Sequence, residues 1–167
     1  MAEVDPFRLR VLKTLCSRLE EIHPDKGYNF DLSGRVFRGR LMFGEDDPVP
    51  LVSVLEAPLP DGSDESPQGS PHWKGPWKLY IQGWVDDDKD HPTDPAHFLM
   101  ADVRKVLAIE RRKGLRQNTI LGEQGRVLDI QFGGAVVRPP EEFVSAYANF
   151  MLLVTLQIVE NTDDPYY

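Results

Sequence analysis

Five aspartates and two histidines lie within the fourteen residues VDDDKDHPTDPAHF, at positions 85–98. Carboxylates and imidazoles at short spacing are typical ligands of divalent metals, and a bound metal activates water for hydrolysis. His91, Asp94 and His97 form the best-spaced set of ligands. One interpretation of this stretch is therefore a metal-dependent hydrolase that uses residues 86–97.

The prolines of the same stretch favour a structural interpretation. His91 precedes Pro92 and is biased towards extended backbone, and Asp94 precedes Pro95, where its carboxylate is placed to cap a helix. Thr93 offers a second capping side chain. A cap accounts for the prolines, the threonine and Asp94 together, whereas a metal site accounts only for the acidic and histidine residues. We therefore expect no metal and no cofactor.

The run of aspartates before His91 also has two interpretations. At a solvated strand end, its negative charge would favour the N-terminus of the following helix. As a functional surface, it would repel phosphate groups. The run consists of Asp86, Asp87, Asp88 and Asp90.

The segments on either side of the stretch predict the elements that it connects. Residues 77–86, WKLYIQGWVD, alternate apolar and mixed positions with period two, which predicts a strand. Apolar residues after His97 recur at helical spacing, and Gly114 follows a basic last turn. We expect a helix over residues 95–113 with Gly114 in the left-handed capping position.

The rest of the chain predicts one further helix and more strands. An amphipathic helix is expected over residues 6–22, with Asp5 as its N-cap. GRVFRGRLMF and LVSVLEAP are expected to form an antiparallel pair, and a long mobile loop is expected over residues 57–76. Strands are also expected in VLDIQFGGAVV and NFMLLVTLQIVEN. The fold class is α+β, a mainly antiparallel sheet with two main helices on one face.

Composition indicates a single domain over residues 1–167. Hydrophobic residues make up 41% and charged residues 28% of the chain, which is ordinary for a globular protein. A net charge of -8 disfavours gripping nucleic acid. Cys16 is expected to be a buried helix position. No secretion signal or membrane span is recognisable, so the protein is expected in a cytoplasm and away from membranes.

The sequence contains no motif that assigns a reaction. GxxxxGK[ST], GxSxG, a paired CxxC and a helix-opening GxGxxG are all missing. Cys16 has no histidine near it in the sequence to activate a thiol nucleophile. We therefore expect that the protein is not an enzyme.

The order of elements and several local patterns resemble the tail terminator, or tail completion, proteins of long-tailed bacteriophages. The resemblance lies in the N-terminal amphipathic helix, GRVFRGR leading into PLVSVLEAP, the long polar loop, WKLYIQGWVDD, the DPAHFLMADVRKVL helix and the closing VVRPPEE…ANFMLLVTLQIVEN strand. It covers nearly the whole chain, although none of these patterns is a catalytic signature.

The resemblance implies a structural protein of the virion that forms a homohexameric ring on the head-proximal end of the tail tube. Such a ring, assembled in the host cytoplasm, ends tube polymerisation and provides a surface for head-tail joining. Its partners would be the major tail tube protein and a head-completion or neck protein, and double-stranded DNA would pass through without specific binding. The resemblance also implies a sheet flanked by helices and no cofactor. An alternative is another connector or neck subunit.

Individual interface positions are inferred from this chain rather than from the resemblance. Arginines near the first strand, tryptophans and the C-terminal tyrosines are candidate interface residues, since Trp, Tyr and Arg are enriched at binding hot spots. The aspartate run is the candidate for a surface that faces the lumen of a ring. The interface candidates are Arg38, Arg40, Trp73, Trp84, Tyr166 and Tyr167, and the lumen candidates are Asp86, Asp87, Asp88 and Asp90.

Overall fold

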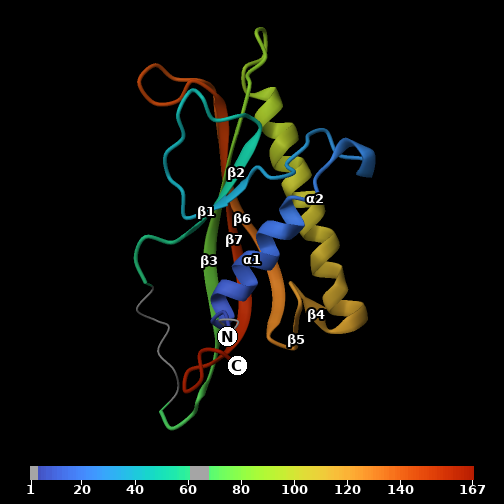
Figure 1. The fold of residues 1–167 in the computed structure, drawn as a ribbon, viewed down its shortest axis with the longest axis vertical. Coiled ribbons are helices and arrows are strands. Elements are labelled where there is room, and N and C mark those ends of the chain that lie inside the picture. Colours follow the sequence, from blue (N-terminus) through green and yellow to red (C-terminus); the bar gives the residue numbers. More distant parts are fainter. Residues whose placement is uncertain (1–3, 61–67) are drawn as a thin grey trace.

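The computed structural model describes residues 4–60 and 68–167. Its main sheet has five strands in the order β1-β2-β3-β7-β6, mainly antiparallel, and two helices cover one face (Figure 1). The chain forms one compact α+β domain, as the sequence predicted. The elements are α1 (Phe7–Leu19), η1 (Pro24–Lys26), β1 (Val36–Arg38), β2 (Leu51–Glu56), β3 (His72–Val85), α2 (Asp94–Gln117), β4 (Thr119–Ile120), β5 (Glu123–Gln124), β6 (Val127–Arg138) and β7 (Ala148–Asn161).

The two longest strands, β3 and β7, form the centre of the sheet. They pair antiparallel over their whole length, from His72 opposite Asn161 to Val85 opposite Ala148. Alternate residues from Trp77 to Val85 and from Ala148 to Ile158 are buried under the helices, in agreement with the period-two pattern. Gly83 faces Phe150 across the two strands, and a Cβ at Gly83 would lie 2.3 Å from the Phe150 ring. The glycine therefore makes room for the aromatic ring.

Helix α1 is shorter than expected. Its apolar stripe is buried, but it ends at Leu19, and Ile22 completes the buried set from the turn that follows. Asp5 is not the N-cap, because Pro6 occupies that position and the Asp5 carboxylate instead pairs with the Lys13 ammonium at 2.7 Å. An ion pair with the next turn thus replaces the expected cap.

Helix α2 is longer than expected. It continues through Gly114 to Gln117, and Asn118, with a φ of 51°, takes the left-handed position and donates its N–H to the Gly114 carbonyl. Gly114 is needed for packing instead, since a Cβ there would lie 2.8 Å from the Ile120 side chain. The prediction that Gly114 ends the helix was wrong.

Strands β1 and β2 pair parallel, so the antiparallel pairing expected from the sequence was wrong. Val36 lies opposite Val52 and Arg38 opposite Val54. Strand β1 ends at Arg38, and Gly39, with a φ of 67°, turns the chain away before the alternating residues that follow can extend the strand. Residues 39–50 then form a loop that takes the chain back to the end of the sheet where β1 begins, and β2 starts there.

The expected loop over residues 57–76 also needs a new boundary. Residues 72–76 belong to β3 and pair with β7, because the alternation of Trp73 and Trp77 continues the buried side of that strand. The mobility expected for the loop falls on residues that include 61–67, which lie outside the described part of the chain. In the part that is described, no helix is long and apolar enough to cross a membrane.

Candidate interaction groove

The aspartate-rich stretch forms a connection from β3 to α2 that is organised by Asp88. The Asp88 carboxylate accepts hydrogen bonds from the N–H groups of Asp90, at 2.9 Å, and His91, at 2.7 Å. These N–H groups, that of His91 first, lower the pKa of Asp88. These hydrogen bonds of Asp88 support the interpretation of the stretch as a structural turn. Asp86, Asp87 and Asp90 are exposed beside this turn.

The helix cap expected from Asp94 is not made. Thr93 occupies the N-cap position of α2 without a side-chain capping bond, and Asp94 is the first helical residue. Its N–H donates to the His91 carbonyl at 3.1 Å, and Pro95 needs no acceptor because it has no N–H. The negative charge of Asp94 in the first turn still favours the N-terminus of the helix.

The candidate metal ligands do not gather into one site. His91 and Asp94 border a hollow beside Phe30 and Pro50, whereas His97 borders a different hollow beside Met100 and Phe132. Across residues 4–60 and 68–167, no group of three or more His, Cys, Asp or Glu side chains is placed to hold a metal ion.

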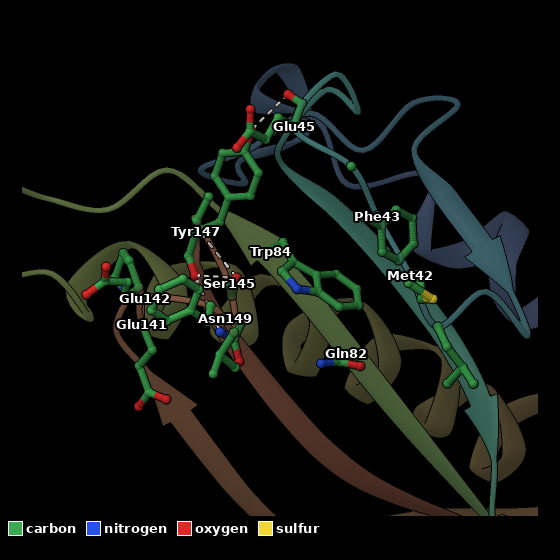
Figure 2. Close-up of a pocket in the computed structure, with 16 residues that line it drawn as sticks. Met42, Phe43, Glu45, Gln82, Trp84, Glu141, Glu142, Ser145, Tyr147 and Asn149 are labelled. Atoms are coloured by element: carbon green, nitrogen blue, oxygen red, sulfur yellow. Dashed lines mark hydrogen bonds between the residues drawn. The ribbon is translucent and has the colours of Figure 1, made fainter.

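A groove of about 850 Å³ lies at one end of the molecule, between the 39–50 loop and residues 139–147, here the 139–147 loop (Figure 2). Its floor comes from the ends of β3 and β7, on the sheet face opposite the helices. The lining residues are Leu41, Met42, Phe43, Gly44, Glu45, Gln82, Trp84, Pro140, Glu141, Glu142, Phe143, Val144, Ser145, Ala146, Tyr147 and Asn149.

Aromatic packing positions the 39–50 loop against the sheet. The Phe43 ring lies 4.6 Å from the Trp84 ring and 5.6 Å from the Phe37 ring, centroid to centroid, at tilted angles. Trp84 is 8% exposed, so the indole forms a covered floor. This packing explains why the face of β3 that carries Trp84 is aromatic.

Arg40 fixes the shape of the same loop. Its guanidinium lies 4.4 Å from the Phe43 ring centroid and 5.0 Å from that of Phe37, and it binds the Asp47 carboxylate at 2.9 Å. The Arg40 carbonyl accepts a hydrogen bond from the Ser53 hydroxyl at 2.7 Å. The Gly44 N–H and, after it, the Arg40 guanidinium lower the pKa of Asp47. A loop held at these points presents its apolar residues outward.

The 139–147 loop carries the most exposed aromatic residue of the groove. Glu141 and Ser145 exchange backbone hydrogen bonds, and Arg138 pairs with Glu141. Between them, Phe143 has a φ of 64° and is 99% exposed. A bulky residue in the left-handed region is rare and often marks a functional position. The phenyl ring is therefore held away from the core of its own chain.

A single hydrogen bond joins the two loops across the groove. The Tyr147 hydroxyl donates to the Glu45 carbonyl at 3.2 Å (Figure 2). The groove also carries exposed apolar side chains, and the carboxylates of Glu45 and Glu142 have no ion-pair partner within residues 4–60 and 68–167. The exposed apolar residues are Leu41 at 70%, Met42 at 84%, Phe143 at 99% and Val144 at 75%.

The lining chemistry is that of a binding surface. Apolar and aromatic side chains dominate it, with acidic groups and without a histidine, cysteine, lysine or arginine among the lining residues. Exposed aromatic and methionine side chains of this kind are enriched at protein interfaces. Such a groove is suited to an apolar segment that carries positive charge.

Two of the residues predicted for an interface belong to this site, Arg40 as a support of the 39–50 loop and Trp84 as the floor. Trp73 lies instead in the core, 6% exposed, with the Arg8 guanidinium 5.8 Å from its ring centroid. Arg38 lies beside the Cys16 thiol, whose pKa is raised by burial and lowered to a smaller extent by Arg38.

The C-terminal tyrosines are partly exposed but held in place, at the end of the molecule opposite the groove. The Tyr166 carbonyl accepts a hydrogen bond from Arg10 at 2.8 Å, and the Arg126 guanidinium lies 5.3 Å from the centroid of the Tyr167 ring. The Phe7 N–H also donates to the Pro165 carbonyl at 2.8 Å. These contacts give the tyrosines a structural role, and an interface role for them stays a prediction.

Sequence reasoning missed the 139–147 loop as part of a site. The signal in the sequence was the apolar pair Phe143 and Val144 directly after two prolines and two glutamates, where a polar turn is expected. Comparison with protein-family models finds no match for this chain, and comparison with curated protein sequences finds none either.

Proposed function

We propose that this protein is a tail terminator of a long-tailed bacteriophage, a subunit of a homohexameric ring that caps the head-proximal end of the tail tube. The ring ends tube polymerisation and offers its free side to a head-completion or neck protein. The observation that carries the proposal is the groove, an exposed apolar surface held by two loops on an α+β domain. Such a surface is characteristic of a protein that works in an assembly.

The fold supports the same proposal. The resemblance implies a sheet flanked by helices, and this chain has a five-stranded sheet with α1 and α2 on one face. The opposite face carries exposed Met151 and Val136 beside the groove. A sheet with one uncovered, partly apolar face gains stability from contact with another protein surface.

The net charge of -8 supports a ring through which DNA slides. Phosphates are held by clustered Lys and Arg, so an acidic lining lets DNA pass without binding it. In this proposal, the exposed aspartates of the turn between β3 and α2 face the lumen.

Charge reversal tests whether the aspartate run faces the lumen of the ring. Reversal of Asp86, Asp87 and Asp90 to lysine should leave folding nearly intact, because these side chains accept no hydrogen bond in the described part of the chain. Asp88 must be spared, since it holds the turn. Slower DNA passage in the triple variant supports a lumen-facing run, whereas normal infectivity places the run on the outside of the ring.

Tail assembly with and without the protein tests the function. Tails made without it should lack the terminal ring and vary in length in electron micrographs, and addition of the purified chain should restore the ring. Light scattering at high concentration should detect a mass of six 19.0 kDa chains. If tails made without the protein have normal length and carry the terminal ring, the proposal is excluded.

Binding measurements separate the tail terminator from another neck subunit. A terminator binds the end of purified tail tubes before any head protein is added. A neck subunit binds the connector instead and leaves tube length unchanged. Pull-down of tubes and of connectors in parallel distinguishes these outcomes.

A further inference from the structure

We propose that the groove binds the outward face of α2 of a second copy of this chain, which makes the subunit contact head-to-tail. The inference rests on the proposed ring and specifies which surfaces build it. It follows from two surfaces of the same molecule that are complementary in charge and in apolar character. One surface is the groove, and the other is a row of exposed residues on α2.

The row on α2, here the α2 stripe, follows helical spacing along the side turned away from the core. It combines apolar and basic residues, all of them exposed, and Leu115 lies next to it. Ile109 is 45%, Phe98 55% and Leu115 90% exposed. The α2 stripe consists of Phe98, Ala101, Lys105, Ile109, Arg112 and Arg116.

The positive charge of the stripe is uncompensated at its C-terminal end. Two neighbouring basic residues are already paired within the chain: Arg111 binds Asp129 at 2.7 Å, and Lys113 binds Glu110 at 2.6 Å. Arg112 and Arg116, which lie on the stripe, have no ion-pair partner within residues 4–60 and 68–167. Two free guanidiniums therefore stand beside exposed Ile109 and Leu115.

The groove offers the opposite set of groups. Glu45 and Glu142 are exposed carboxylates without an ion-pair partner in the described part of the chain. Leu41, Met42 and Phe143 supply exposed apolar surface around them. An amphipathic helix laid into an apolar groove is a common mode of recognition, and opposite charges at its border fix its orientation.

The two surfaces lie on different faces of the molecule. The floor of the groove is on the sheet face opposite the helices, whereas the α2 stripe is on the outward side of a helix that covers the other face. In Figure 1, α2 begins near the end that carries the 39–50 and 139–147 loops, and its C-terminal turn lies at the lower right, away from both loops. The groove therefore cannot bind the stripe of its own chain. A contact between two different patches is heterologous, and it closes into a ring or continues as a filament.

Charge reversal on each surface tests the contact. In the groove variant, Glu45→Arg and Glu142→Arg are combined, and in the helix variant, Arg112→Glu and Arg116→Glu are combined. Each variant places like charges across the proposed contact, so we expect its self-association constant to weaken at least about a hundredfold. Sedimentation velocity over a range of concentrations measures this constant.

A mixture of the two variants should restore assembly. The arginines of the groove variant then face the glutamates of the helix variant, and the unchanged surfaces face each other as in the wild type. An equimolar mixture should therefore form a ring of alternating subunits, although each variant alone stays monomeric. A contact elsewhere on the molecule gives no such rescue.

Matched controls carry the same changes of net charge at other exposed positions. Asp87→Arg with Asp163→Arg matches the groove variant, and Lys74→Glu with Lys89→Glu matches the helix variant. Both controls should assemble like the wild type. Circular dichroism melting of all variants establishes that each one is folded.

The outcomes separate this inference from the proposed function. Variants that assemble like the wild type, a mixture that fails to assemble, or a wild-type chain that stays monomeric even on tail tubes would overturn the inference. If the variants assemble normally and also cap tails, only the inference fails. If the mixture is rescued but no form of the ring caps tails, only the proposed function fails.

Discussion

Glu110 of α2 and Arg18 of α1 form an ion pair, with the Arg18 Nε 2.9 Å from the Glu110 carboxylate. Glu110 is 1% exposed and also accepts hydrogen bonds from the Lys113 ammonium at 2.6 Å and from the Leu121 N–H at 2.7 Å. One buried carboxylate thus connects both helices and the turn after α2. A buried charge is tolerated because each of these groups compensates it.

Glu110→Gln should lower the free energy of unfolding by about 2 kcal/mol or more, because Arg18 and Lys113 lose a buried anionic partner. The matched control is Glu21→Gln, which removes the other partner of Arg18, a pair 3.1 Å long with Glu21 44% exposed. The control should cost less than about 0.5 kcal/mol. Urea unfolding measures both, and equal losses would contradict the role of Glu110.

The same carboxylate makes stability depend on pH. Burial raises the pKa of Glu110, but the Lys113 ammonium, the Leu121 N–H and the Arg18 guanidinium together outweigh it, so that the pKa is lowered. The unfolded chain, with a glutamate pKa of about 4.3, then binds more protons than the folded chain.

The stability contributed by Glu110 is therefore fully present above about pH 4.3 and is lost as the pH falls through the lower pKa of the folded state. Urea midpoints from pH 7 down to pH 3 should fall more steeply for the wild type than for Glu110→Gln. If the urea midpoints of the two proteins fall equally steeply with pH, Glu110 does not cause the pH dependence of stability.

Gly83→Ala should destabilise the domain, because the new Cβ would lie 2.3 Å from the Phe150 ring and neither strand can move away from its partner. Overpacking of this kind costs about 1–3 kcal/mol. Gly134→Ala is the control, since a Cβ there meets no atom within 4 Å. Thermal melting compares the two, and a Gly83→Ala protein as stable as Gly134→Ala would refute the packing argument.

Asp88→Asn should loosen the turn between β3 and α2, because the amide is a weaker acceptor for the N–H groups of Asp90 and His91. Loss of such charge-assisted bonds costs about 1 kcal/mol. Asp87→Asn, one residue away and exposed, serves as the control. Amide exchange at Asp90 and His91 should accelerate only in the Asp88 variant, and unchanged protection would argue against this role.

Periodic patterns allowed most of the fold to be predicted from the sequence. The alternation from Trp77 to Val85 and that from Phe150 to Ile158 correctly gave the two central strands, because burial on one face of a sheet imposes period two. In β6, by contrast, a register shift between Val127 and Asp129 brings Val127 into the core and leaves Leu128 39% exposed. Such an irregularity leaves no mark in a periodic pattern.

The errors have a common physical origin in features that depend on distant residues. The parallel pairing of β1 follows from a loop held by Arg40, Asp47 and Ser53, and the end of α2 depends on Ile120 packing against Gly114. The groove likewise joins loops about a hundred positions apart in the sequence. Local propensity describes none of these contacts. Arg40 and Trp84 were predicted for an interface from their residue types, and they lie at the groove, where an interface role for them stays a prediction.

The pairing of β3 with β7 has a consequence for how quickly the chain folds. Val85 must find Ala148 and His72 must find Asn161 before the centre of the sheet exists, and all of α2 and β6 lies between them in the sequence. Closing such large loops costs entropy before any long-range contact compensates for it, and high contact order slows folding. During synthesis, β3 therefore waits without its main partner until the last strand has been made, and in that interval its apolar face is open to aggregation.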